Sequence, residues 1–216
     1  MSTRLETLPD AQGVAQALAG LLAERLRQGG RAVLAGGQTP LPAYRLLGRR
    51  SLPWKAIELI PSDERCLEPE SPERNDRQIG LALGQPEVRL HRFPAERGPA
   101  LAAAQMEGVV TALLPFAVVV LGLGEDGHTA SLFPGHPLGV EALVAPVYRA
   151  PKPPPQRVTL TPKALAQTSL LVFVVTGAEK REALERVLRG EPLPPNHIAA
   201  PQRLFLCDRA ALPSLG

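Results

Sequence analysis

The stretch that decides the fold is residues 116–135, which read FAVVVLGLGEDGHTASLFPG. Its first five residues are apolar and rich in valine, a composition typical of a strand buried on both faces of a sheet. Three glycines then follow within six residues, and they allow a sharp turn that leaves backbone N–H groups facing outward. Two carboxylates and His128 share this turn. Open α/β enzymes place their chemistry where a buried strand ends, so the turn is a candidate active site.

The rest of the chain alternates between helical and extended patterns. Apolar residues at helical spacing predict helices at residues 11–28, 40–49, 74–83, 97–114 and 178–189. Short apolar runs predict strands at residues 31–35, 56–60, 88–93, 116–121, 143–147, 158–160, 170–175 and 203–207. We expect Asp10 to cap the first helix, and Thr39 to cap the second with Pro40 at its first helical position. Strands separated by helices pair in parallel, so we predict one domain over residues 1–216: an α/β fold with an open, mainly parallel sheet flanked by helices.

Composition narrows the class of protein. The 216 residues are 44% hydrophobic and 21% charged, which is typical of a globular chain. The net charge of +3 is not gathered into a basic run, so we predict no nucleic-acid partner; an anionic small molecule suits this charge equally well. No apolar run approaches the ~20 residues that span a bilayer, so no membrane partner is expected. A monomer is the default expectation.

Cysteine and histidine usage bears on localisation and metals. The chain has two cysteines, far apart and without a C-x-x-C motif, and its first ten residues are polar and charged rather than a signal peptide. A reduced, cytoplasmic protein is therefore expected. The sequence contains no H-x-x-x-H or H-E-x-x-H motif, so no metal site is predicted.

Polar groups follow four of the predicted strands, and parallel strands bring such ends to one edge of the sheet. The first is a glycine turn, with Gly36, Gly37 and Thr39. Free N–H groups before a helix suit a phosphate or a hydroxyl, although an ordinary strand–helix turn is the alternative. The second holds Asp63 and Arg65. The planar arginine fork suits phosphate, whereas a solvated salt-bridge cluster is the competing interpretation.

Two further cations are candidates. Lys180 stands in the first turn of a predicted helix, where the helix dipole disfavours a cation, so it indicates either a bound anion or a side chain that reaches into water. Arg157 follows a proline-stiffened loop, and its spacing leaves ligand contact and an ion pair equally open.

His128 is the best catalytic candidate. Its ordinary pKa near 6.5 lets it accept a proton at neutral pH. Asp126 or Glu125 could orient the ring, and a histidine that caps the next helix is the alternative. Ser131 lacks a G-x-S-x-G context, which argues against a serine hydrolase.

These motifs resemble those of one family. Residues 122–135 look like the signature of 6-phosphogluconolactonases, and the resemblance extends to residues 36–40 (GGQTP), 62–66 (SDERC), Asn75, 153–161 (PPPQRVTLT) and 177–180 (GAEK). The family usually has serine and tyrosine on either side of Asn75, where this chain has Arg74 and Asp76. The resemblance implies an open α/β fold shared with glucosamine-6-phosphate deaminases and ribose-5-phosphate isomerases.

The resemblance also implies an activity: hydrolysis of 6-phospho-D-glucono-1,5-lactone to 6-phosphogluconate in the oxidative pentose phosphate pathway, without a metal or organic cofactor. The expected partner is this sugar phosphate. His128 and Asp126 would be catalytic, and the expected substrate-binding residues are Gly36, Gly37, Thr39, Asp63, Arg65, Asn75, Gly124, Arg157 and Lys180.

Two other functions stay open. Deaminases share the glycine–histidine turn but carry a glutamate about five residues after the histidine, where this chain has SLFPG over residues 131–135. Lactone hydrolysis needs only a base, a water and a stabilised oxyanion, so the missing carboxylate favours the lactonase. A sugar-phosphate-binding regulator is the other alternative, and retention of His128 with its adjacent acids argues against it.

Overall fold

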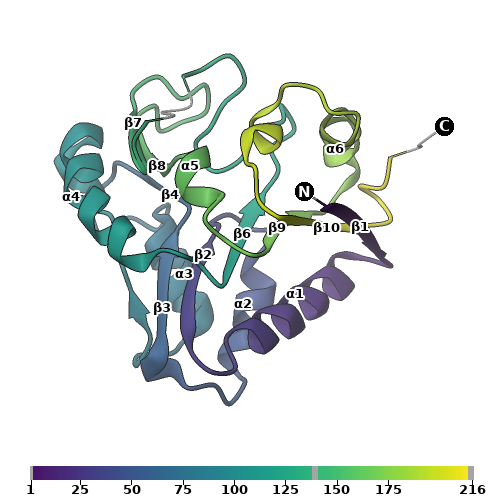
Figure 1. Ribbon diagram of the computed structural model, residues 1–216, viewed down its shortest axis with the longest axis horizontal. Helices are drawn as coiled ribbons and strands as arrows, with labels where there is room; N and C mark the ends of the chain where they lie inside the picture. The colour runs from purple at the N-terminus through teal and green to yellow at the C-terminus, as the bar shows by residue number, and fades with distance from the viewer. Residues whose placement is uncertain (1, 138–140, 214–216) are drawn as a thin grey trace.

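The main sheet has seven strands, and the computed structural model in which it is seen describes residues 2–137 and 141–213 (Figure 1). All neighbours in this sheet are parallel, in the order β1-β10-β9-β6-β2-β3-β5. Its strands are β1 (Ser2–Leu8), β2 (Gly30–Leu34), β3 (Ile57–Pro61), β5 (Arg89–Leu90), β6 (Val118–Gly122), β9 (Leu171–Val175) and β10 (Gln202–Asp208). The predicted fold class is confirmed.

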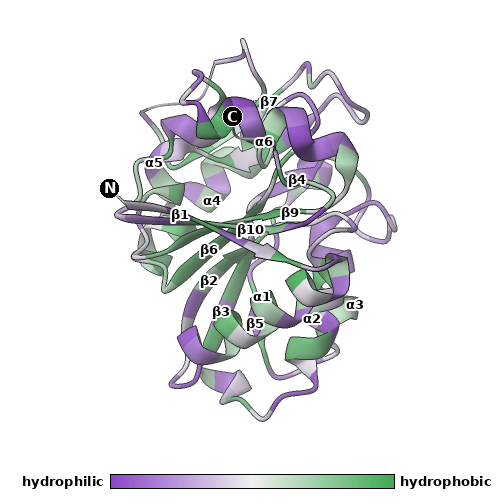
Figure 2. Ribbon diagram, turned by 90° about the vertical axis from the view of Figure 1, so that its right-hand side faces the viewer, coloured by the Kyte–Doolittle hydropathy of each residue, from purple (hydrophilic) through white to green (hydrophobic). Residues whose placement is uncertain are grey.

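Helices cover both faces of the sheet, and Figure 2 shows the apolar strands between these layers. They are α1 (Ala11–Arg25), α2 (Leu41–Gly48), α3 (Asn75–Leu83), α4 (Pro99–Leu113), α5 (Pro162–Leu165) and α6 (Arg181–Leu188). Buried side chains of α1, α2 and α3 form one core cluster, and those of α4, α5 and α6 join the other. Successive side chains of β2 point to opposite faces of the sheet and so contribute to both clusters. Ala32 and Leu34 lie in the first cluster, and Val33 lies in the second.

The strand order reverses between β2 and β6. From β2 the chain proceeds to β3 and β5 on one side, and from β6 it proceeds to β9 and β10 on the other. The loops that leave β2 and β6 therefore diverge, and ligands of open α/β sheets bind in the crevice at such a point. Both glycine turns picked out in the sequence follow these two strands.

A second, antiparallel sheet borders this crevice. It consists of β4 (Asp63–Arg65), β8 (Arg157–Leu160) and β7 (Val144–Val147), in the order β4-β8-β7. Asp63 pairs with Thr159, and Arg65 pairs with Arg157. The sequence indicated residues 63–65 as the end of a strand, whereas they form a strand of their own whose partner lies almost a hundred residues away. This pairing brings two of the predicted cation positions together.

Several local predictions can be compared with the structure. The Asp10 cap is confirmed, since its Oδ1 accepts from Gly13 N at 2.8 Å. The Thr39 cap is wrong: α2 begins at Leu41 without a side-chain cap, because Pro40 already has helical backbone angles and its carbonyl accepts from Ala43 N. The predicted strand at residues 88–93 shortens to β5, and β1 was not predicted.

The segment after β9 also differs from the expected single helix. Residues 178–180 form a 3₁₀ turn, and α6 begins only at Arg181, so Lys180 stands at the junction of the two. Further 3₁₀ turns lie at Trp54–Ala56, Ala95–Arg97 and Pro194–His197. No helix within residues 2–137 or 141–213 is both long and apolar enough to cross a membrane.

Candidate active site

A cavity of about 200 Å³ lies where the loops after β2, β3, β6 and β9 meet. One sheet edge gathers these loops because the four strands are parallel, so segments distant in sequence line one space. Every residue predicted to bind substrate is among its lining residues, and so is His128: Gly36, Gly37, Thr39, Asp63, Arg65, Asn75, Gly124, Arg157 and Lys180. Asp126 is not among the lining residues and reaches the cavity only through its contact with His128.

His128 and Asp126 form a dyad. Asp126 Oδ1 lies 2.5 Å from His128 Nδ1 and 3.3 Å from the His128 backbone nitrogen. The turn is tight, which brings the two residues together. The backbone N–H of Gly124 donates to the carbonyl of His128, the N–H of Gly127 donates to the carbonyl of Gly124, and Gly127 has a positive φ. The carboxylate contact occupies Nδ1, which leaves Nε2 as the ring nitrogen to exchange a proton. The centroid of the Phe133 ring lies 4.8 Å from that of the imidazole, so this aromatic side chain packs beside the histidine.

The surroundings keep the imidazole neutral. Burial lowers the pKa of His128 below its ordinary value of 6.5; Asp126 and, more weakly, Asp63 oppose this, while Lys152 adds to it. Burial raises the pKa of Asp126, but the hydrogen bonds and charge of His128, together with the charge of Lys152, outweigh it, so the pKa of this carboxyl is lowered. Near neutral pH the pair is therefore a neutral imidazole beside a carboxylate, the protonation state that a general base needs.

Two glycines permit close approach in the site. A Cβ at Gly124 would collide with His128 Nδ1, and a Cβ at Gly36 would collide with the amide of Asn75. Neither position requires a left-handed backbone, so glycine is needed there for space alone.

The cavity is rich in cations. Arg65, Lys152, Arg157 and Lys180 line it, against one carboxylate, Asp63. Such an excess of positive charge attracts an anionic ligand. Lys180 is also bonded to Glu125 of the signature turn, with Nζ 3.2 Å from Oε1. Lys152 was not among the predicted residues; a lone lysine inside a rigid proline loop was the signal that could have identified it.

Arg157 holds the proline loop. Its Nε donates to Pro154 O at 3.0 Å, and its Nη2 donates to Lys152 O and Pro153 O, both at 3.0 Å. The guanidinium carbon lies 5.7 Å from the centroid of the Phe133 ring. The sequence left ligand contact and an ion pair equally open for Arg157. The structure adds a third role, because this side chain fixes the backbone that carries Lys152.

Asp63 connects β4 with the signature turn. Its Oδ2 accepts from Ser131 Oγ at 2.6 Å, and its Oδ1 accepts from Ser62 Oγ at 2.8 Å. Asn75 Nδ2 donates to the Asp63 carbonyl at 2.8 Å. Neither serine was predicted as a site residue. On the sequence alone, Ser131 is considered only as a possible nucleophile. Their hydroxyls instead orient a buried carboxylate that faces the cavity.

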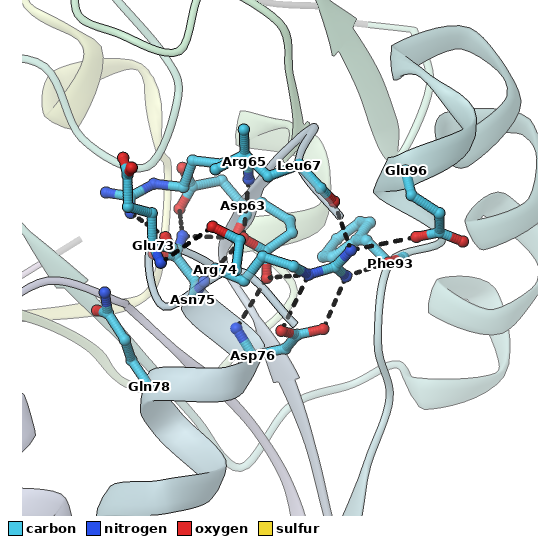
Figure 3. Close-up of polar contacts among 12 residues, drawn as sticks. Asp63, Arg65, Leu67, Glu73, Arg74, Asn75, Asp76, Gln78, Phe93 and Glu96 are labelled. Carbon is cyan, nitrogen blue, oxygen red and sulfur yellow. Dashed lines mark hydrogen bonds and ion pairs between the residues drawn. The ribbon is translucent and has the colours of Figure 1, made fainter. Parts of the chain in front are cut away.

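Two buried polar atoms at the cavity are unsatisfied. Arg65 Nε, a donor, and Asn75 Oδ1, an acceptor, have no hydrogen-bond partner among the described residues (Figure 3). Buried polar groups of this kind are costly unless a ligand or water completes them. Both residues are among the lining residues of the cavity.

In the part of the chain that the structure describes, no group of three or more histidine, cysteine, aspartate or glutamate side chains is placed to hold a metal ion.

Known proteins share this sequence and architecture. The family model described as glucosamine-6-phosphate isomerases/6-phosphogluconolactonase matches residues 9–207. A 6-phosphogluconolactonase of Nostoc sp. is 32% identical, and the match covers 98% of each chain. The crystal structure of 6-phosphogluconolactonase from Thermotoga maritima superposes with a TM-score of 0.89 at 27% identity, covering 96% of this chain and 100% of the other.

A more distant neighbour shows the fold alone. A monomeric glucosamine-6-phosphate deaminase superposes with a TM-score of 0.80 at 18% identity, covering 96% of this chain and 98% of the other.

The curated relatives support an enzyme of the 6-phosphogluconolactonase type. The chain belongs to the glucosamine-6-phosphate isomerase/6-phosphogluconolactonase family.

Proposed function

We propose that the protein hydrolyses 6-phospho-D-glucono-1,5-lactone to 6-phosphogluconate, with His128 as the general base. The observation that carries this proposal is the His128–Asp126 dyad at the wall of a small cavity that four cationic side chains line. A neutral imidazole can activate water, and the cations suit the phosphate of the substrate. The names of the relatives support the same reaction.

The reaction needs one proton carrier. His128 Nε2 takes a proton from water as the water oxygen bonds to C1, and the carbonyl electrons move onto the carbonyl oxygen. The oxyanion then collapses, the bond between C1 and the ring oxygen breaks, and the imidazolium returns its proton to that oxygen. Asp126 stabilises the imidazolium between these two steps, because its carboxylate is held against Nδ1.

The other lining residues divide between the two ends of the substrate. Arg65 and Lys180 are proposed to hold the 6-phosphate, with Lys152 as a further cation near the dyad. Backbone N–H groups of the glycine turns, or Nη1 of Arg157, are proposed to stabilise the oxyanion. One such donor is typically worth about 3–4 kcal/mol of transition-state stabilisation.

A substrate comparison tests the reaction class. Freshly generated 6-phosphogluconolactone is coupled to 6-phosphogluconate dehydrogenase, with the spontaneous rate subtracted, and glucosamine 6-phosphate is assayed in parallel for ammonia release. Lactone turnover without ammonia release is expected. Ammonia release without lactone turnover would instead favour a deaminase. Thermal stabilisation by 6-phosphogluconate without either reaction would identify a sugar-phosphate-binding regulator.

A further inference from the structure

Arg74 is a buried arginine outside the cavity, and its side chain is only 2% exposed. Its guanidinium uses all five N–H donors (Figure 3). Two of them reach the Asp76 carboxylate in a bidentate pair, from Nε to Oδ1 at 3.1 Å and from Nη2 to Oδ2 at 2.8 Å. The others reach Leu67 O, Phe93 O and Glu96 Oε2 at 2.7–3.1 Å. Arg74 therefore ties two separate segments, at residue 67 and at residues 93–96, to the start of α3.

A fully buried glutamate completes this junction. Glu64, in β4, accepts from the backbone nitrogens of Asn75 and Asp76, both at 2.8 Å. These are the first two N–H groups of α3, which have no partner inside the helix. The start of α3 is thus held from two sides, by Glu64 and by the Arg74–Asp76 pair.

The segment that Arg74 fixes contacts two lining residues of the cavity. The carbonyl of Glu73, one residue before Arg74, accepts from Arg65 Nη1. Asn75, one residue after it, donates from Nδ2 to the carbonyl of Asp63. Figure 3 shows these contacts in one view with the Arg74 guanidinium. The buried Nε of Arg65 keeps its donor unused among the described residues.

We propose that Arg74 is a positioning residue for anion binding: it fixes residues 73–76, which hold the Arg65 guanidinium at the angle that an anion in the cavity requires. The inference rests on the proposed function only in taking that anion to be the 6-phosphate. A lysine cannot replace Arg74, because an ammonium has three donors and no planar fork to match two carboxylates and two backbone carbonyls.

The test combines binding and kinetics in a double-mutant cycle. Wild type, Arg74→Lys, Arg65→Ala and the double variant are compared for the Kd of 6-phosphogluconate by calorimetry and for KM and kcat with the lactone. Arg77→Lys is the matched control, because Arg77 lies in the first turn of the helix that Arg74 precedes and pairs with Glu70 in an exposed bridge. Should Arg74→Lys fail to fold, Arg74→Gln/Asp76→Asn replaces it, since this pair removes the opposite buried charges of Arg74 and Asp76 together.

Arg74→Lys is expected to raise Kd and KM about tenfold, the cost of one misplaced charge-assisted hydrogen bond, with kcat within about threefold. In the Arg65→Ala background the same change is expected to alter Kd less than about twofold, because the two residues act as one unit. Arg77→Lys is expected to match wild type.

Three results would overturn the inference: an Arg74→Lys protein with lowered Tm but unchanged Kd, effects of Arg74→Lys and Arg65→Ala that multiply, or a wild-type protein that does not bind 6-phosphogluconate. A wild type that binds 6-phosphogluconate but does not hydrolyse the lactone contradicts the proposed function alone, and the Kd values then decide the role of Arg74.

Discussion

At the residue scale, one imidazole carries the chemistry of the proposed reaction. His128 is 18% exposed, so water reaches it while burial keeps it neutral. Asp126 works in the opposite direction, because its carboxylate favours the imidazolium. The balance gives a base that is ready near neutral pH and a conjugate acid that is stabilised during turnover.

Asp126→Asn is expected to lower kcat and to move the acid limb of the pH profile of kcat/KM to lower pH. Activity needs neutral His128, so the limb follows the pKa of this histidine. Asp126 raises that pKa, and its removal therefore lowers it. The profile of kcat/KM from pH 4.5 to 8 measures the shift. A limb that moves to higher pH, or kcat equal to that of wild type, would contradict the assigned role of Asp126.

Gly124→Ala tests the steric argument. The added methyl would collide with His128 Nδ1, so the imidazole must leave its place beside Asp126. We expect kcat to fall by about 10²-fold, since a displacement of about 1 Å is enough for such a loss. Gly108→Ala is the control, because a Cβ at this helical position meets nothing within 4 Å. Steady-state kinetics of both variants measure the effect; equal kcat values would refute the steric argument.

At the element scale, the junction of β4 and α3 depends on a buried carboxyl. Glu64 is 0% exposed, and burial, followed by repulsion from Asp76, raises its pKa from 4.5 to about 7. The folded state therefore binds this proton more tightly than the unfolded state. The stability that Glu64 contributes is complete below pH 4.5 and is lost as the pH rises through about 7.

Glu64→Gln is expected to flatten the pH dependence of stability. In wild type this one group lowers the free energy of unfolding by up to about 3 kcal/mol between pH 4.5 and 7, on the order of 1.4 kcal/mol per pKa unit. The amide does not titrate, so the variant loses that slope, although it is less stable throughout because an amide nitrogen cannot accept an N–H. Urea unfolding at several pH values measures the slope, with the exposed Glu70→Gln as control. Parallel curves for Glu64→Gln and wild type would contradict the account.

At the scale of the whole molecule, parallel strand order explains which features the sequence predicts. Residues near positions 36, 63, 124 and 180 meet because each follows a strand of one parallel sheet. The positions of the strands in the sequence are enough to predict this meeting. The Glu64–Arg74 junction could not be predicted from the sequence. Arg74 donates to the backbone carbonyls of Leu67 and Phe93, and a residue of any type has such a carbonyl. Strand β4 was hidden for a similar reason: three charged residues do not have a strand pattern, and β8 supplies the pairing.

The edge strand β1 also escaped prediction. Its seven residues are mostly exposed, so they show no apolar run, and their partner β10 lies at the other end of the chain. Deleting residues 1–8 is expected to lower Tm by about 5 °C or more and to cause self-association, because the edge of β10 loses its seven-residue partner. Calorimetry and light scattering at matched concentration measure both effects. An unchanged Tm with an unchanged mass would show that β1 does not stabilise the sheet.

The central claim is that His128 is the base of a lactone hydrolysis. The most direct measurement is the rate of 6-phosphogluconate formation from fresh 6-phosphogluconolactone, corrected for spontaneous opening, for wild type and His128→Asn. The account predicts wild-type turnover well above background, and a kcat about 10²–10⁴-fold lower in the variant with KM changed only a few-fold. Near-full turnover by His128→Asn would contradict the claim, as would a wild type that does no better than water.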